Sequence, residues 1–152
     1  MADYKRIIFA ENDGATRAPM AVKLFKSISP QSNTDVICRG LVVPFPAPLN
    51  RKTEAVMISK DAPWEDFMSA QLTDEDVTDS TLILVMDERQ RRQVLSRIEH
   101  ANEENTFVLS KYVGDELEIV DPYGGSLQNY GICYEMMKSS IEKLITILKK
   151  EK

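Results

Sequence analysis

The sequence predicts a single α/β domain built on a mainly parallel β-sheet. Short apolar runs of strand length alternate with segments whose apolar residues recur every three or four positions, which is typical of strand–helix–strand units. The chain has 152 residues, enough for one hydrophobic core and too few for two ordinary ones. Since it contains no internal repeat and no linker-like segment, we expect one domain spanning residues 1–152.

Three kinds of local signal place the elements along the chain. Continuous apolar runs indicate buried strands, and the clearest of them covers residues 81–86. A proline after a turn-rich segment indicates the first turn of a helix, as at Pro19. The C-terminal helix has apolar residues in steps of three and four and ends in lysines, which favour the negative end of the helix dipole. These signals predict strands at residues 6–10, 35–43, 81–86 and 106–109, and helices from Pro19, from about Lys52, at residues 88–98 and after Gly125.

Composition and charge exclude several classes of protein. Hydrophobic residues make up 43% and charged residues 28%, which argues against long disordered segments, and the net charge of -5 argues against a nucleic-acid partner. No apolar run approaches the roughly 20 residues that cross a membrane, and no signal-peptide pattern is seen. Cys38, Cys133 and His100 are too few for a disulfide framework or a Cys/His zinc site. We therefore expect a cytoplasmic protein without a cofactor or a membrane partner.

Residues 11–17 are the first candidate for a ligand site. In a parallel sheet, ligands bind beyond the carboxyl ends of the strands, beside the first strand. A loop that leads from a strand into a helix exposes backbone N–H groups and the positive end of the helix dipole, which suits an anion. Arg17 would add a planar cation to such a site. The alternative is an ordinary connecting loop with a solvent-exposed arginine, and spacing alone favours that alternative.

Three separated motifs resemble those of the low-molecular-weight protein tyrosine phosphatases. Residues 6–21 (RIIFAENDGATRAPMA) resemble the family's N-terminal strand, its loop of Cys, five residues and Arg, and the Ser-Pro-Met-Ala that opens a helix. Residues 81–87 (TLILVMD) resemble its Leu-Ile-Leu-Val-Met strand, and residues 121–125 (DPYGG) its Asp-Pro-Tyr/Phe loop. The motifs agree in order and spacing over essentially the whole chain. The resemblance implies a flavodoxin-like three-layer sandwich with a four-stranded parallel sheet, of the phosphotyrosine protein phosphatase I-like type.

The resemblance assigns roles to individual residues and shows where this chain departs from the family. The phosphate-binding arginine falls on Arg17, the general acid on Asp121, and an aromatic residue of the phosphotyrosine cleft on Tyr123. The nucleophilic cysteine, which forms a phosphocysteine in the family, falls on Glu11, and the serine after the arginine falls on Ala18. The expected phosphate-binding loop consists of Asn12, Asp13, Gly14, Ala15, Thr16, Arg17 and Ala18.

These departures predict a catalytically impaired member of the family. Neither cysteine is a substitute nucleophile, because a strand sends Cys38 and Arg39 to opposite faces and Cys133 lies on the apolar face of the last helix. We expect a pseudophosphatase that acts as a binding or regulatory module, and the resemblance suggests phosphate or a phosphotyrosine protein as its partner. The alternative is an active phosphomonoester or phosphotyrosine hydrolase with a non-standard loop, so the sequence leaves open whether the protein is an enzyme.

The Glu11 side chain suggests two alternatives for the site itself. Its carboxylate extends further than a cysteine sulfur, so it is expected to accept the loop N–H groups and pair with Arg17 as a built-in ligand. In the second alternative, Glu11, Asp13 and Asp87 at two strand ends, together with Asp121, converge on one rim and hold a divalent cation, as in receiver-like domains.

Overall fold

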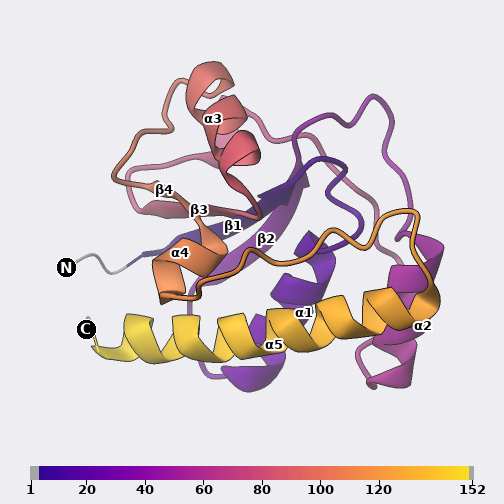
Figure 1. Cartoon of the computed structure of the whole chain (residues 1–152). Coiled ribbons are helices and arrows are strands. Elements are labelled where there is room, and N and C mark those ends of the chain that lie inside the picture. Colours follow the sequence, from indigo (N-terminus) through magenta and orange to yellow (C-terminus); the bar gives the residue numbers. More distant parts are fainter. Residues whose placement is uncertain (1–3, 151–152) are drawn as a thin grey trace.

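The structure, a computed structural model, describes residues 4–150 and shows a three-layer α/β architecture (Figure 1). A four-stranded parallel sheet with the order β2-β1-β3-β4 forms the middle layer. This result confirms the fold class predicted from the sequence. The strands are β1 (Arg6–Glu11), β2 (Asp35–Gly40), β3 (Thr81–Val85) and β4 (Thr106–Val108), and the helices are α1 (Ala18–Ile28), α2 (Arg51–Ser59), α3 (Glu88–Arg97), α4 (Leu109–Val113) and α5 (Leu127–Lys150), with one 3-10 turn, η1 (Asp74–Asp76).

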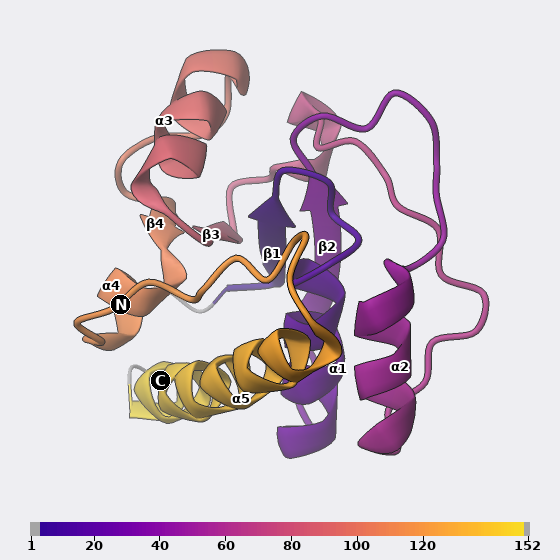
Figure 2. The same ribbon diagram turned by 45° about the vertical axis from the view of Figure 1, so that its right-hand side comes forward.

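The central strand β1 is buried on both faces because helices cover both sides of the sheet (Figures 1 and 2). Ile7 and Phe9 point into the larger core, which the sheet shares with α1 and α5. Ile8 and Ala10 point to the other face, into a smaller core closed by Val94 of α3. The alternation of a strand thus explains why the sequence of β1 is continuously apolar. Within residues 4–150, no helix is both long and apolar enough to cross a membrane.

Several element boundaries differ from the sequence prediction by one residue or more, and two of these differences have a clear structural cause. The second strand ends at Gly40 instead of residue 43, because the N–H of Leu41 is shared between the carbonyls of Glu11 and Asn12 and the N–H of Val42 donates to Asn12, which lies in the loop beyond β1. The fourth strand ends at Val108, and the helix α4 follows directly and closes at Gly114, whose φ of 84° is left-handed. Both corrections come from contacts or turns that an apolar run does not encode.

A close backbone contact fixes the segment after β1 against the end of β2. Gly14 has a φ of 69°, and a Cβ atom built on it would lie 2.6 Å from the backbone nitrogen of Gly40. A Cβ atom on Gly40 would in turn lie 2.8 Å from the carbonyl carbon of Asp13. Both positions therefore require glycine, and the contact determines where the connecting loop lies relative to the sheet.

We expect Gly14→Ala to lower the free energy of unfolding by roughly 2–4 kcal/mol, because it combines left-handed strain with a clash against backbone atoms. Gly131→Ala is the matched control: Gly131 lies inside α5, and nothing lies within 4 Å of its added Cβ, so its stability should stay equal or rise by up to about 1 kcal/mol. Urea denaturation measures the free energy of unfolding of both variants. Equal effects of the two substitutions would contradict the proposed contact.

Candidate functional site

The loop of residues 12–17 connects β1 to α1 at the carboxyl end of the sheet (Figure 2). The side chain of Asp13 organises this loop from within. One of its oxygens accepts the N–H of Ala15 at 2.9 Å, and the other accepts the hydroxyl of Thr16 at 2.9 Å. Gly14, which lies between Asp13 and Ala15, has a left-handed backbone conformation and turns the chain there. The loop is therefore shaped by its own side chains.

The carboxylate of Glu11, the last residue of β1, occupies the centre of this loop. Its Oε2 accepts the backbone N–H of Thr16 at 3.2 Å, of Arg17 at 2.7 Å and of Ala18 at 2.6 Å. Its Oε1 lies 3.4 Å from Nε of Arg17. Ala18 is the first residue of α1, so the carboxylate also faces the positive end of the helix dipole. The structure confirms the built-in ligand that the sequence suggested.

Burial raises the pKa of the Glu11 carboxyl group, which is only 2% exposed. The nearby charge of Arg17 and the N–H groups of Ala18 and Arg17 lower that pKa again, while the charge of Asp13 adds to the increase. A buried carboxylate is costly unless it is paired and hydrogen-bonded. The ionised form of Glu11 thus depends on the donors that converge on it.

Arg17 links the loop to a distant part of the chain. Its side chain is buried, and besides its ion pair with Glu11, its Nη1 donates to the carbonyl of Ile119 at 3.0 Å. Ile119 belongs to residues 114–126, the segment that leads from α4 to α5. The arginine expected to bind phosphate is therefore occupied by groups of the protein itself.

The N-terminus of α2 braces the loop from the other side. The N–H of Asn50 donates to the carbonyl of Ala15 at 3.0 Å. The hydroxyl of Thr53 donates to the backbone carbonyl of Thr16, also at 3.0 Å. Asn50 also caps α2 and donates to the hydroxyl of Tyr130 at 3.2 Å. Sequence reasoning missed Asn50 and Thr53. The signal for Asn50 was present, since asparagine is a preferred residue directly before a helix.

A cavity of about 210 Å³ lies beside the loop, where residues from distant segments meet. Asp121 and Tyr123 reach it from the segment of residues 114–126, and Oδ1 of Asp121 accepts the N–H of Tyr123 at 3.1 Å. The Tyr123 side chain is 72% exposed. The structure therefore brings together the four residues to which the resemblance gave catalytic or cleft positions. The cavity is lined by Glu11, Asn12, Asp13, Thr16, Arg17, Asp121 and Tyr123.

The structure does not assemble the alternative cation site. Asp87 does not line the cavity; its side chain caps α3 by accepting the N–H of Gln90 at 2.8 Å. Among residues 4–150, no group of three or more His, Cys, Asp and Glu side chains is arranged to hold a metal ion. The expectation that Asp87 shares a ligand set with Glu11 and Asp13 is therefore wrong, because a local capping role fixes its carboxylate.

Neither cysteine provides a nucleophile for the site. Cys38 lies in β2 and Cys133 in α5, and both are buried free thiols. Burial raises the pKa of each thiol to about 12, and for both the negative charge of Glu11 contributes to the increase. Since the thiolate is the reactive species, both groups are inert at neutral pH.

We expect both thiols of the folded protein to be unreactive toward a thiol reagent such as Ellman's reagent at pH 7–8 and to react when the chain unfolds. The reaction rate should follow the opening of the protein, so it should rise with sub-denaturing urea. A thiol that reacts at once in the native protein, followed by absorbance and located by mass spectrometry, would contradict this assignment.

Comparison with known proteins identifies the family to which this site belongs. The model of the low molecular weight phosphotyrosine protein phosphatase family matches residues 6–152. The chain is 28% identical over 139 residues to the low molecular weight protein-tyrosine-phosphatase PtpB of Staphylococcus epidermidis, covering 91% of this chain and 96% of PtpB. It is 29% identical over 152 residues to a protein-arginine-phosphatase of Bacillus subtilis, covering 96% and 98% of the two chains.

Solved structures give the same result. The YwlE arginine phosphatase of Geobacillus stearothermophilus superposes with a TM-score of 0.86 at 25% identity, covering 96% of this chain and 94% of its own. A low molecular weight protein tyrosine phosphatase of T. tengcongensis also reaches 0.86 at 25% identity, covering 93% and 97%. Since the family match begins with β1 and runs through all the strands and helices that form the site, the chain belongs to the low molecular weight phosphotyrosine protein phosphatase family.

Proposed function

We propose that this protein is a pseudophosphatase, a member of its family that binds a partner and does not hydrolyse phosphate esters. The observation that carries the proposal is the Glu11 carboxylate in the centre of the loop. Phosphoryl transfer to a protein side chain needs an activated nucleophile and a set of donors that receive the phosphate oxygens. In this chain one carboxylate takes the place of the nucleophile and also uses the donors.

The chemistry of the remaining groups supports the same proposal. Both oxygens of Glu11 are engaged, Oε2 by three backbone N–H groups and Oε1 by Arg17, so attack on phosphorus would have to break these bonds. The two thiols are buried and protonated at neutral pH. Asp121 still lines the cavity in the position of the general acid, but without a phosphoryl acceptor it has no leaving group to protonate.

The names of the relatives suggest the class of partner. One is named for protein tyrosine and another for protein arginine, so side chains of other proteins are the ligands we propose for this chain. A reducing, cytoplasmic location is part of the proposal, and the free thiols Cys38 and Cys133 are consistent with it. The alternative is an active hydrolase, which the retained Arg17 and Asp121 and the relatives named as phosphatases favour.

We expect no turnover of para-nitrophenyl phosphate by the purified protein above the rate of Asp121→Asn, a variant of an exposed residue that keeps the acceptor for the N–H of Tyr123. Glu11→Cys alone should restore little activity, because Asp13 also stands where the family's loop has a glycine and Ala18 where it has a serine. Release of phosphate at a rate that Asp121→Asn abolishes would favour the active hydrolase. Strong activity of Glu11→Cys would show that Glu11 is the sole impairment.

We expect Glu11→Ala to open the loop to inorganic phosphate or vanadate. Removing one partner of a buried ion pair should lower the free energy of unfolding by roughly 3–5 kcal/mol, because Arg17 and three N–H groups lose their acceptor. Phosphate should then restore part of the lost melting temperature at constant ionic strength, since it binds only the folded state. The wild type should not respond to phosphate.

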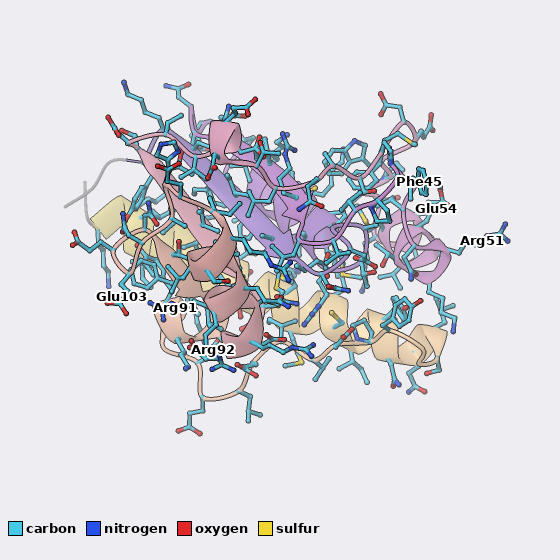
Figure 3. The ribbon with its side chains drawn as sticks, turned by 90° about the horizontal axis from the view of Figure 1, so that it is seen from above. Phe45, Arg51, Glu54, Arg91, Arg92 and Glu103 are labelled. Atoms are coloured by element: carbon cyan, nitrogen blue, oxygen red, sulfur yellow. The ribbon has the colours of Figure 1, made fainter. Side chains whose placement is uncertain are left out.

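Glu103→Ala is the matched control, because it removes the same charge from an exposed position after α3 (Figure 3). It should melt like the wild type with and without phosphate. If Glu11→Ala is too unstable to purify, Glu11→Ser provides a smaller polar side chain for the same titration. Equal phosphate responses of the wild type and of the Glu11 variants would refute the built-in ligand.

A further inference from the structure

The cavity beside the loop is acidic because its cation is already neutralised. Of the seven residues that line the cavity within the described part of the chain, Arg17 is the single cation, and it is buried against Glu11. The other charged residues that line the cavity are Asp13 and Asp121. Asp121 is exposed, and the hydrogen bond that the structure shows for it involves Oδ1 alone, so Oδ2 has acceptor capacity for a ligand. Such a cavity repels phosphate and attracts a cation.

Two segments with exposed apolar residues are bonded to the loop that lines this cavity. Residues 41–50 are tied to the loop at both ends, by bonds from Val42 to Asn12 and from Asn50 to Ala15. The segment of residues 114–126 is tied to the loop through Arg17, and in Figure 2 the indigo loop lies between this orange segment and the purple one. The exposed fractions on the two segments are 52% for Val42, 79% for Phe45, 42% for Val120 and 72% for Tyr123.

We propose that these residues form a docking surface, made of Asp13, Asp121 and Tyr123 at the cavity and Val42, Phe45 and Val120 on the two segments bonded to the loop, for a protein segment that carries an unmodified arginine among apolar residues. The proposal rests on the proposed function, in which the site binds without chemistry. A guanidinium group is planar, donates to carboxylates and stacks on aromatic rings, so it matches Asp13, Asp121 and Tyr123. Apolar neighbours of that arginine would cover Phe45 and Val42, as in the centre of a protein interface.

The charges around the docking surface do not reverse its sign. Lys52 reaches the same segment, but its Nζ donates to the carbonyl of Gly125 and lies over the ring of Tyr130. Near Phe45, Arg51 and Glu54 of α2 carry opposite charges (Figure 3). Arg91 and Arg92 of α3 lie on the opposite side of this view from Phe45 (Figure 3). Charge complementarity therefore favours a cationic segment over an acidic or phosphorylated one.

Three capped peptides test this inference against the full chain labelled with ¹⁵N. Each has the same apolar flanks, and the central residue is arginine, citrulline or phosphotyrosine. We expect the arginine peptide to shift the amide signals of the docking surface saturably, and the neutral citrulline peptide to bind at least about fivefold more weakly. The phosphotyrosine peptide should also bind more weakly than the arginine peptide. A lack of saturation by the arginine peptide up to about 5 mM, or tighter binding of phosphotyrosine, overturns the inference.

Variants locate the binding on the proposed surface. Asp121→Asn keeps the acceptor for the N–H of Tyr123 and removes the charge, while Tyr123→Ala and Phe45→Ser truncate exposed rings without touching the core. Each should weaken the arginine peptide about threefold to tenfold. Glu103→Gln, the exposed control after α3, should leave the affinity unchanged. Unchanged affinity in Asp121→Asn or Phe45→Ser overturns the docking surface.

A separate measurement distinguishes this failure from that of the proposed function. Phosphate release from the phosphotyrosine peptide, assayed in the same samples, would refute the pseudophosphatase whatever the affinities are. Weak or indiscriminate binding without phosphate release would refute the arginine-specific surface alone.

Discussion

The hydrogen bonds that converge on the Glu11 carboxylate hold the functional end of this molecule together. Three consecutive N–H groups, ending with the first residue of α1, point at Oε2, and the guanidinium of Arg17 pairs with Oε1. Arg17 passes this restraint on to residues 114–126 through the carbonyl of Ile119. One buried carboxylate thus fixes the loop, the start of a helix and a segment from the other end of the chain, and removing it would leave several buried donors without an acceptor.

The same interaction explains how a loop suited to a bound anion can instead be filled by a side chain of the protein. A loop of converging N–H groups at a helix N-terminus binds any anion of suitable size, and a side-chain carboxylate is such an anion. Since this carboxylate is part of the chain, it cannot dissociate from the loop, and it pairs with Arg17. The carboxylates of Asp13 and Asp121 are then the remaining charged side chains that line the cavity, so its charge has the opposite sign from that of an open phosphate cradle.

The frame around the loop is built from backbone contacts and helix ends. Gly14 and Gly40 approach so closely that no side chain fits at either position, and the N-terminus of α2 adds bonds from Asn50 and Thr53. These contacts hold the loop from two sides, while the side chains of Phe45 and Tyr123 on the neighbouring segments are exposed. A loop that is filled by a side chain of its own protein supports the proposed binding role over turnover.

The sequence by itself determined the order of the four strands and of α1, α2, α3 and α5, because apolar periodicity and proline positions are local properties of the chain, whereas α4 was not predicted. It also placed Glu11, Arg17 and Asp121 in one site, since the order of the motifs matches that of a known family. Only the tertiary structure decided that β2 ends at Gly40, that Asp87 caps α3 and that Arg17 binds a carbonyl 102 positions away. Each of these depends on contacts between residues distant in sequence or on competition between local partners, which residue spacing alone does not encode.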